Sequence, residues 1–204
     1  MAFPMGTIAL ILICYAIGSV SFAVLVSRAC GLPDPRTYGS GNPGATNVMR
    51  TGKKAAAVLT LLGDGAKGWA AVFLAQQLAP SWGVGEVGIA ACALATFLGH
   101  LFPVFFGFKG GKGVATTAGI LLALNLWLGL AVLVSWILTF AVSRISSLSA
   151  LVAAALAPVY ALFFLSKPYV LMVLVLALLL IWRHRANIRN LLHGKEGDFK
   201  KAQE

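Results

Sequence analysis

Charged residues are scarce in this chain, and acidic residues are the scarcest. Only 11% of the 204 residues are Asp, Glu, Lys or Arg, whereas 59% are hydrophobic. The mean hydropathy is +0.89. A soluble domain carries roughly 25% charged residues, and no packing of a chain this short hides so much apolar surface from water. The composition therefore excludes an ordinary soluble protein and predicts an integral membrane protein.

Cysteine is also rare, and strand-like patterns are missing. Cys14, Cys30 and Cys92 are odd in number and two of them lie in apolar runs, which argues against a disulfide framework. No cluster of His, Cys and carboxylate residues has metal-ligand spacing, so we expect no metal and no other cofactor. Because no alternating β pattern is present, helices must satisfy the backbone in lipid.

Six apolar runs are candidates for membrane spans, which take about 20 helical residues each. They cover residues 5–27, 55–79, 86–106, 114–143, 146–166 and 168–182. No basic segment precedes the first run, so we expect a retained span rather than a cleaved signal peptide. The second run is the weakest prediction, since it contains Asp64 and Lys67.

The longest run, 114–143, decides the topology. As one helix it would be about 45 Å long, so we expect a tight helical pair that turns near residues 125–129. All strongly basic loops then lie on one face, the cytoplasmic one, as the positive-inside rule requires. These loops and the tail hold Arg28, Arg36, Arg50, Lys53, Lys54, Lys109, Lys112, Arg144, Arg183, Arg185, Arg189, Lys195, Lys200 and Lys201. We predict one all-α domain over residues 1–204, a polytopic bundle of seven transmembrane helices with the N-terminus outside and the C-terminus cytoplasmic.

The stretch GSGNPGATNVMR, residues 39–50, contains the dinucleotide-binding pattern G-x-G-x-x-G. That fingerprint needs a preceding strand and a following helix, but here a membrane span precedes it and Pro43 interrupts it. A loop that binds phosphate is the better interpretation, because glycines let backbone N–H groups surround an anion and Arg50 offers a planar fork. Its neutral donors are Ser40, Asn42, Thr46 and Asn47. An ordinary turn remains the alternative.

Two further polar clusters lie next to apolar runs. KGGKGVATT, residues 109–117, places two lysines among glycines before a helix, where donors and the helix dipole favour phosphate. Lysines that mark the end of a span are the alternative. RHRANIR, residues 183–189, puts His184 and Asn187 on one helical face; we expect Arg183, Arg185 and Lys200 to be boundary charges. Asp64 and Lys67 are expected to pair inside the bundle, and His100 to be an interior histidine.

These blocks together resemble the bacterial PlsY-type acyl-phosphate:glycerol-3-phosphate acyltransferases. The resemblance extends over SGNPGATNVMR (40–50), DGAKG (64–68), GHLFP (99–103), FKGGKGVAT (108–116) and RHRANIR (183–189), and Glu196 resembles a glutamate of that family. It implies an enzyme of the bacterial inner membrane that transfers an acyl group from acyl phosphate to the sn-1 hydroxyl of glycerol 3-phosphate. Lysophosphatidic acid and inorganic phosphate are the products, and neither CoA nor acyl carrier protein is the donor.

The resemblance also implies site residues. Glycerol 3-phosphate would be held and its hydroxyl oriented by Ser40, Arg50, Lys109, His184 and Asn187. Acyl phosphate would be bound by Asn42, Gly44, Thr46, Asn47, Gly110, Gly111, Lys112, Gly113, Thr116 and Thr117. The base is either His184 or a phosphate oxygen of the donor, and we favour the donor.

Other classes fit the sequence less well. A nucleic-acid-binding protein would place its basic residues on a soluble face. HGKEGD, residues 193–198, matches the H-x-x-x-x-D pattern of CoA- or carrier-dependent acyltransferases, but it lies in a charged tail. A transporter for an organic phosphate would also have cationic sites, but we would expect its polar groups near the midplane of repeated helices. Partners are therefore expected to be the two substrates and membrane lipids.

Overall fold

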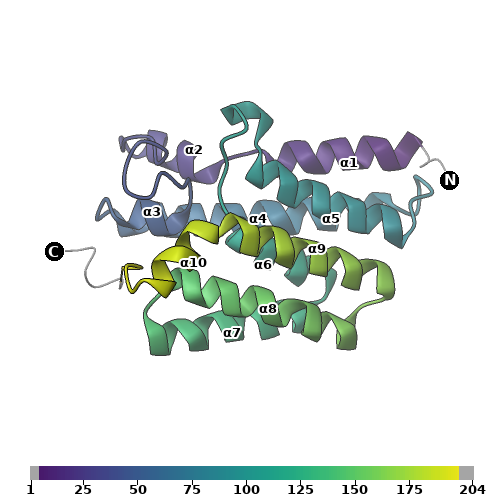
Figure 1. The fold of residues 1–204 in the computed structure, drawn as a ribbon. Coiled ribbons are helices and arrows are strands. Elements are labelled where there is room, and N and C mark those ends of the chain that lie inside the picture. The colour runs from purple at the N-terminus through teal and green to yellow at the C-terminus, as the bar shows by residue number, and fades with distance from the viewer. Residues whose placement is uncertain (1–4, 198–204) are drawn as a thin grey trace.

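The computed structural model describes residues 5–197 and is a bundle of helices that run roughly along one axis (Figure 1). The main helices are α1 (Met5–Gly18), α4 (Lys54–Leu78), α5 (Glu86–Leu101), α6 (Val114–Leu124), α7 (Leu126–Ser143), α8 (Ser146–Phe164) and α9 (Lys167–Arg183). Shorter helices are α2 (Phe22–Ala29), α3 (Ala45–Met49), η1 (Val104–Phe106) and α10 (Arg185–Leu192). No strand occurs between residues 5 and 197, which confirms the predicted all-α class. Lys200, Lys201 and Asp198 lie outside the described residues.

Most of the main helices are long and apolar enough to cross a membrane. Within residues 5–197 five segments qualify, namely Met5–Ala29, Lys54–Leu78, Glu86–Phe106, Leu126–Ser143 and Ser146–Phe164, and α9 with α10 makes a sixth that is bent by 58°. α6 has 11 residues, about 16 Å of helix, so it reaches only halfway through a hydrocarbon core of ~30 Å. The count of seven crossings includes α6 and stays a prediction.

Two of the predicted runs are each split into two α-helices. The run 114–143 is interrupted at Asn125, whose side chain accepts a hydrogen bond from Leu128 N at 3.0 Å and caps α7. This break confirms the predicted helical pair. The first run is interrupted between α1 and α2, where Lys67 Nζ donates to Val20 O at 2.5 Å. A lysine thus satisfies a backbone carbonyl that the break leaves without a helical partner.

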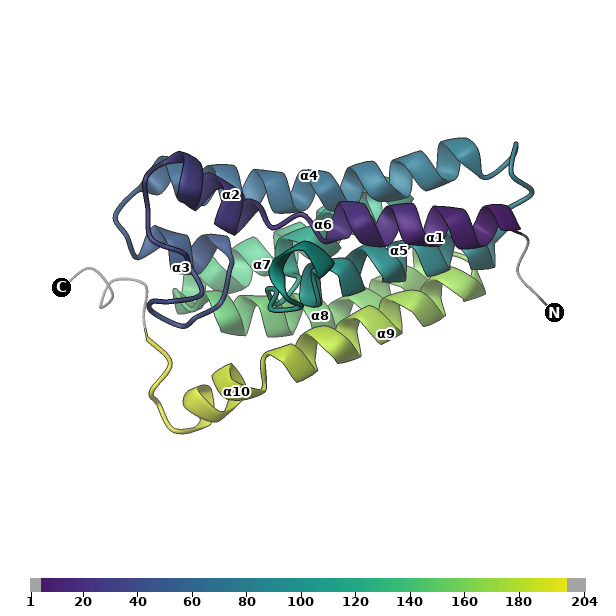
Figure 2. The same ribbon diagram turned by 90° about the horizontal axis from the view of Figure 1, so that it is seen from above.

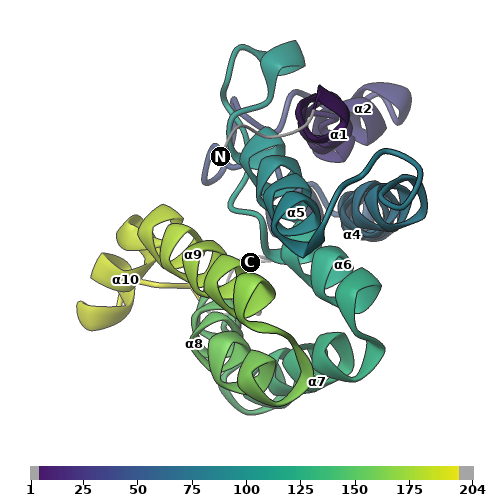
Figure 3. The same ribbon diagram turned by 90° about the vertical axis from the view of Figure 1, so that its right-hand side faces the viewer.

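Glycines bring the helices close together. A Cβ on Gly18 of α1 would collide with the backbone of Thr96 in α5, and a Cβ on Gly68 of α4 with the backbone of Thr116 in α6. Such small residues let membrane helices pack backbone to backbone. Viewed along the bundle, α6 lies between α4 and α7 (Figure 3).

The basic loops gather at one end of the bundle. α3, the turn between α7 and α8, and α10 lie at this end, whereas the start of α1 lies at the other (Figures 1 and 2). At that other end Ser166 Oγ donates to Glu86 Oε2 at 2.7 Å, close to Lys167 in sequence. The loop between α5 and α6 is different, because it lies part-way along the bundle (Figure 2). The first part of this loop projects from the side of the bundle (Figures 1 and 3), whereas Gly110, Gly111 and Gly113 at its end are buried.

Candidate active site

The loop over residues 39–50 is organised by Asn47, which is buried in the middle of α3. Its Nδ2 donates to Pro35 O at 2.7 Å and to Tyr38 O at 3.2 Å. Its Oδ1 accepts from Ser40 N at 3.0 Å and from Arg50 Nη1 at 3.4 Å. An amide side chain has two N–H donors and one acceptor oxygen with two lone pairs. All of these hydrogen-bonding positions of Asn47 are therefore occupied within the loop. The consequence is that Ser40 and Arg50 are held in place while remaining exposed.

The loop over residues 109–113 is tied to α9 by one arginine. Arg183 Nη2 donates to Gly110 O at 2.8 Å and to Gly111 O at 3.0 Å, and its Nε donates to Gly111 O at 3.2 Å. Gly111 N in turn donates to His100 O at 3.2 Å. Gly113 has φ +88°, a conformation that favours glycine. The glycines therefore have a packing role in addition to any role toward an anion.

α10 adds a chain of hydrogen bonds beside this loop. Lys112 Nζ donates to Asn187 Oδ1, and Asn187 Nδ2 donates to Glu196 Oε1 at 2.5 Å. Ser147 Oγ at the start of α8 donates to the same carboxylate oxygen at 2.6 Å. Burial would raise the pKa of Glu196, but the hydrogen bonds from Ser147 and Asn187 outweigh it and hold this pKa below its usual range. Burial lowers the pKa of Lys112. Residues from three segments that are distant in sequence thus fix the position of the Lys112 ammonium group.

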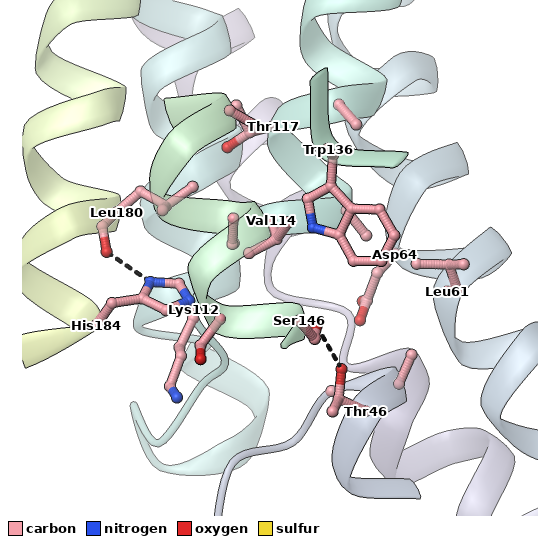
Figure 4. A pocket seen from close by; sticks show the side chains of 18 of the residues that line it. Thr46, Leu61, Asp64, Lys112, Val114, Thr117, Trp136, Ser146, Leu180 and His184 are labelled. Atoms are coloured by element: carbon pink, nitrogen blue, oxygen red, sulfur yellow. Dashed lines mark hydrogen bonds between the residues drawn. The ribbon is translucent and has the colours of Figure 1, made fainter. Parts of the chain in front are cut away.

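His184 lies at the joint between α9 and α10 and is buried. Its Nδ1 is 2.8 Å from Leu180 O (Figure 4). A carbonyl oxygen only accepts, so we assign the proton of the neutral ring to Nδ1, which leaves Nε2 as an acceptor. Burial lowers the pKa of His184 to about 4. At neutral pH this ring can accept a hydrogen bond from a hydroxyl, but it is a weak base.

Asp64 pairs with Lys67 inside the bundle, as the sequence predicted. Lys67 Nζ is 2.8 Å from Asp64 Oδ1, and His100 Nδ1 is 3.7 Å from the same oxygen. His100 Nδ1 also lies 3.1 Å from Thr116 Oγ1. The hydroxyl of Thr116 is thereby engaged within the bundle. Lys67 is turned to the break at Val20, whereas Asp64 and His100 line the cavity described next.

A cavity of about 940 Å³ joins these elements (Figure 4). The predicted site residues that line it are Ser40, Asn42, Gly44, Thr46, Asn47, Arg50, Lys112, Gly113, Thr117, His184 and Asn187. Figure 4 shows Lys112 and His184 on one side of it and the hydrogen bond between Thr46 and Ser146 below. Beyond this polar part the walls are apolar. Leu61 and Leu62 of α4 and Ile137 of α7 line it and are 51%, 61% and 56% exposed, so the cavity opens sideways to lipid.

Lys109 is not part of this cavity. It lines a separate space of about 320 Å³ together with Gly110, Arg36 and Arg183. The structure therefore separates Lys109 from His184 and Asn187, with which the sequence had grouped it, and places Lys112 there instead. Gly110, Gly111 and Thr116 are likewise absent from the lining of the main cavity.

Sequence reasoning missed the roles of two further residues. Arg183 was expected to be a boundary charge like Arg185, but its guanidinium donates to the carbonyls of the glycine loop, whereas the guanidinium of Arg185 lies 4.8 Å from the ring of Trp182. Glu196 had only a family resemblance to mark it, and its contact with Ser147 has no sequence signal. Over residues 5–197 no group of three His, Cys, Asp or Glu residues is arranged to hold a metal.

The arrangement combines cationic and hydroxyl-binding groups with an apolar channel open to lipid. Comparison with known proteins agrees with this chemistry. A family model described as glycerol-3-phosphate acyltransferase matches residues 8–194. The glycerol-3-phosphate acyltransferase of Chromobacterium violaceum is 60% identical over 190 residues, 92% of this chain and 92% of that protein. That of Ralstonia nicotianae is 61% identical over 197 residues, 96% of this chain and 95% of its own length.

Solved structures agree as well. The crystal structure of PlsY, an integral membrane glycerol 3-phosphate acyltransferase, in its glycerol 3-phosphate form has a TM-score of 0.86 and 36% identity, with 94% of each chain covered. Its lysophosphatidic acid form has a TM-score of 0.85 and 34% identity, again with 94% of each chain covered. The chain therefore belongs to the PlsY family of integral membrane glycerol-3-phosphate acyltransferases.

Proposed function

We propose that the acyl donor is a long-chain acyl phosphate and that the acyl group goes to the sn-1 hydroxyl of glycerol 3-phosphate. The products are then lysophosphatidic acid and inorganic phosphate, the first step of phospholipid synthesis. The observation that carries this proposal is the single cavity in which Lys112, Arg50 and His184 lie at the polar end and an apolar channel leads to lipid. Neither CoA, acyl carrier protein nor a cofactor is needed, because acyl phosphate is already an activated anhydride.

The sideways opening suits the acyl chain. About fourteen methylenes are worth roughly 11 kcal/mol of burial at ~0.8 kcal/mol each, so extraction of the donor into water would be very costly. A channel that is walled by exposed Leu61, Leu62 and Ile137 lets the chain stay in apolar surroundings throughout. The same argument applies to the product, which keeps the chain.

The acceptor site in this proposal consists of Ser40, Arg50, Lys112, His184 and Asn187. Arg50 and Lys112 bind the phosphate of glycerol 3-phosphate, and His184 Nε2 accepts a hydrogen bond from a glycerol hydroxyl. Lys109 is not included in this acceptor site, since it lines the smaller cavity.

The donor phosphate occupies the N-terminus of α6. The groups that line the cavity there and remain candidates for it are Asn42, Gly44, Thr46, Gly113 and Thr117. Asn47, Thr116, Gly110 and Gly111 support the two loops, because their polar groups are engaged within the protein or they lie outside the cavity.

Transfer is direct and substrate-assisted. The hydroxyl oxygen forms the new ester bond to the acyl carbon, the bond from that carbon to the phosphate oxygen breaks, and the hydroxyl proton leaves with the phosphate. The low pKa of His184, about 4 as a result of burial, supports a donor oxygen rather than the imidazole as the proton acceptor. The protein contributes position and electrostatic stabilisation.

The site faces the cytoplasm from the bacterial inner membrane in this proposal, with the N-terminus outside. The basic loops at one end of the bundle support that orientation. Labelling of a tag at the C-terminus in intact cells and in opened cells tests it, since only opened cells should label.

Purified protein with glycerol 3-phosphate and either palmitoyl phosphate or palmitoyl-CoA tests the donor. We expect phosphate release and lysophosphatidic acid with palmitoyl phosphate only. Turnover with palmitoyl-CoA at a similar rate would refute the proposed donor. Uptake of glycerol 3-phosphate into vesicles without product would instead indicate a transporter.

A further inference from the structure

Trp136 of α7 has an indole N–H group without a hydrogen-bond partner. Its Nε1 is buried from water, and no acceptor lies within hydrogen-bond distance among residues 5–197. An indole nitrogen is a donor only, and a desolvated donor without an acceptor destabilises the fold. The ring is held by stacking on Phe140, with centroids 5.1 Å apart. The ring orientation that leaves this donor unpaired is therefore maintained by packing.

The unpaired donor lies at the main cavity. Trp136 lines it together with Val114 and Thr117 at the start of α6, and in Figure 4 the edge of the ring that carries the nitrogen faces Val114. Thr117 is 9% exposed, and its Oγ1 is also buried without a partner. By contrast, Ser135, next to Trp136 on α7, pairs with Tyr160 Oη at 2.9 Å. Trp136 and Thr117 both line the cavity, and neither of these two polar atoms has a hydrogen-bond partner among residues 5–197.

This inference rests on the proposed acyl phosphate donor. We propose that Trp136 Nε1–H donates a hydrogen bond to the carbonyl oxygen of the acyl group. Trp136 lies where the polar end of the cavity meets its apolar walls. With the donor phosphate at the N-terminus of α6 and the chain between Leu61 and Ile137, the carbonyl is at this boundary. The carbonyl oxygen is the acceptor on the acyl side of the bridging oxygen of the anhydride.

The hydrogen bond has a catalytic consequence. As the hydroxyl attacks, the carbonyl π electrons move to the oxygen, which gains negative charge until the tetrahedral centre collapses and phosphate leaves. The indole proton stays on nitrogen throughout. A donor on the cavity wall that reaches this oxygen stabilises the charge, and loss of one such donor typically lowers kcat about 10²–10³-fold.

Kinetics of Trp136→Phe give the first test, because phenylalanine keeps one aromatic ring beside Phe140 and removes the indole N–H together with the second ring. We expect kcat to fall about 100-fold while KM for glycerol 3-phosphate changes less than about twofold. Trp127→Phe is the matched control, since Trp127 lies on the same helix, is 66% exposed and is outside the cavity. An unchanged kcat in Trp136→Phe, or equal losses in both variants, would overturn the proposal.

The wild-type protein gives a second test that does not depend on a variant retaining its fold. Protein labelled with ¹⁵N in the tryptophan indoles is mixed either with an acyl phosphonate, which has the carbonyl, or with an alkyl phosphonate, which lacks it. The Trp136 resonance, identified by its absence from the spectrum of Trp136→Phe, should move downfield with the acyl phosphonate only. If both compounds bind and give the same Trp136 shift, the inference about Trp136 is overturned, whereas the proposed acyl phosphate donor is not. If neither compound binds, the proposed donor class is refuted as well.

Discussion

Replacement of Arg183 by lysine should lower activity strongly although it keeps the charge. The guanidinium makes three hydrogen bonds to the carbonyls of Gly110 and Gly111, at 2.8, 3.0 and 3.2 Å. A lysine lacks the planar fork, so at least one carbonyl loses its partner. A hydrogen bond to a charged group is worth about 1.5–3 kcal/mol. If the active conformation of the loop that carries Lys112 loses that much free energy of stabilisation, kcat/KM should fall roughly 10–150-fold.

The assay is phosphate release from palmitoyl phosphate by purified protein, with thermal unfolding in detergent measured beside it. Arg185→Lys is the matched control, since Arg185 is two positions away, exposed, and in contact with Trp182 rather than with the glycine loop. We expect it to stay within about twofold of the wild type, as surface substitutions usually do. If Arg183→Lys keeps more than half of the wild-type kcat/KM, or if Arg185→Lys loses as much, the reasoning is refuted.

Three other predictions follow from the buried polar groups. His184→Ala should lose at least about tenfold in kcat/KM because a buried hydrogen bond to substrate is lost. His193→Ala should stay within about twofold, since His193 is exposed and its Nδ1 lies 2.7 Å from Arg189 O of the preceding helix α10; equal losses would contradict the assignment. The pKa of His184 is lowered by burial to about 4, so an unfolded chain with a pKa of about 6.5 binds this proton first as pH falls. The free energy of unfolding should therefore drop between pH ~6.5 and ~4, and less in His184→Gln; an identical drop in both, measured by thermal unfolding, speaks against it. Asp64→Asn should cost about 3–5 kcal/mol of stability because it leaves Lys67 buried without its partner, and adding Lys67→Met should restore part of it; a stable single variant would contradict the pairing.

Local patterns were sufficient to predict the helices but not all of their lengths. Apolar runs predicted the membrane bundle, and the length of the run 114–143 predicted its break near Asn125. The break between α1 and α2 was not predicted, because the apolar composition continues through it; Lys67, which satisfies the carbonyl of Val20 there, is distant in sequence.

The site was predicted in its residue types more than in its geometry. The sequence placed His184 and Asn187 on one face of a continuing helix. The structure bends by 58° at His184, between α9 and α10, and still places both residues at the main cavity. Lys109 and Lys112 could not be told apart by composition, since both sit among the same glycines. In the structure Arg183 donates to the carbonyls of the two glycines between them, Gly110 and Gly111, and Lys112 lines the main cavity whereas Lys109 lines the smaller one.

The amino-acid sequence alone determined that this chain is a helical membrane protein with basic, glycine-rich loops, because hydropathy and local charge are properties of contiguous segments. The tertiary structure alone decided which lysine of the glycine-rich loop lines the main cavity. It also decided which asparagine has all its hydrogen-bonding groups paired within its own loop, and which indole N–H has no acceptor among residues 5–197. Those outcomes depend on where α6, α9 and α10 meet. Hydrogen bonds are short and directional, so they are settled only once segments far apart in the chain have been brought within about 3 Å of one another.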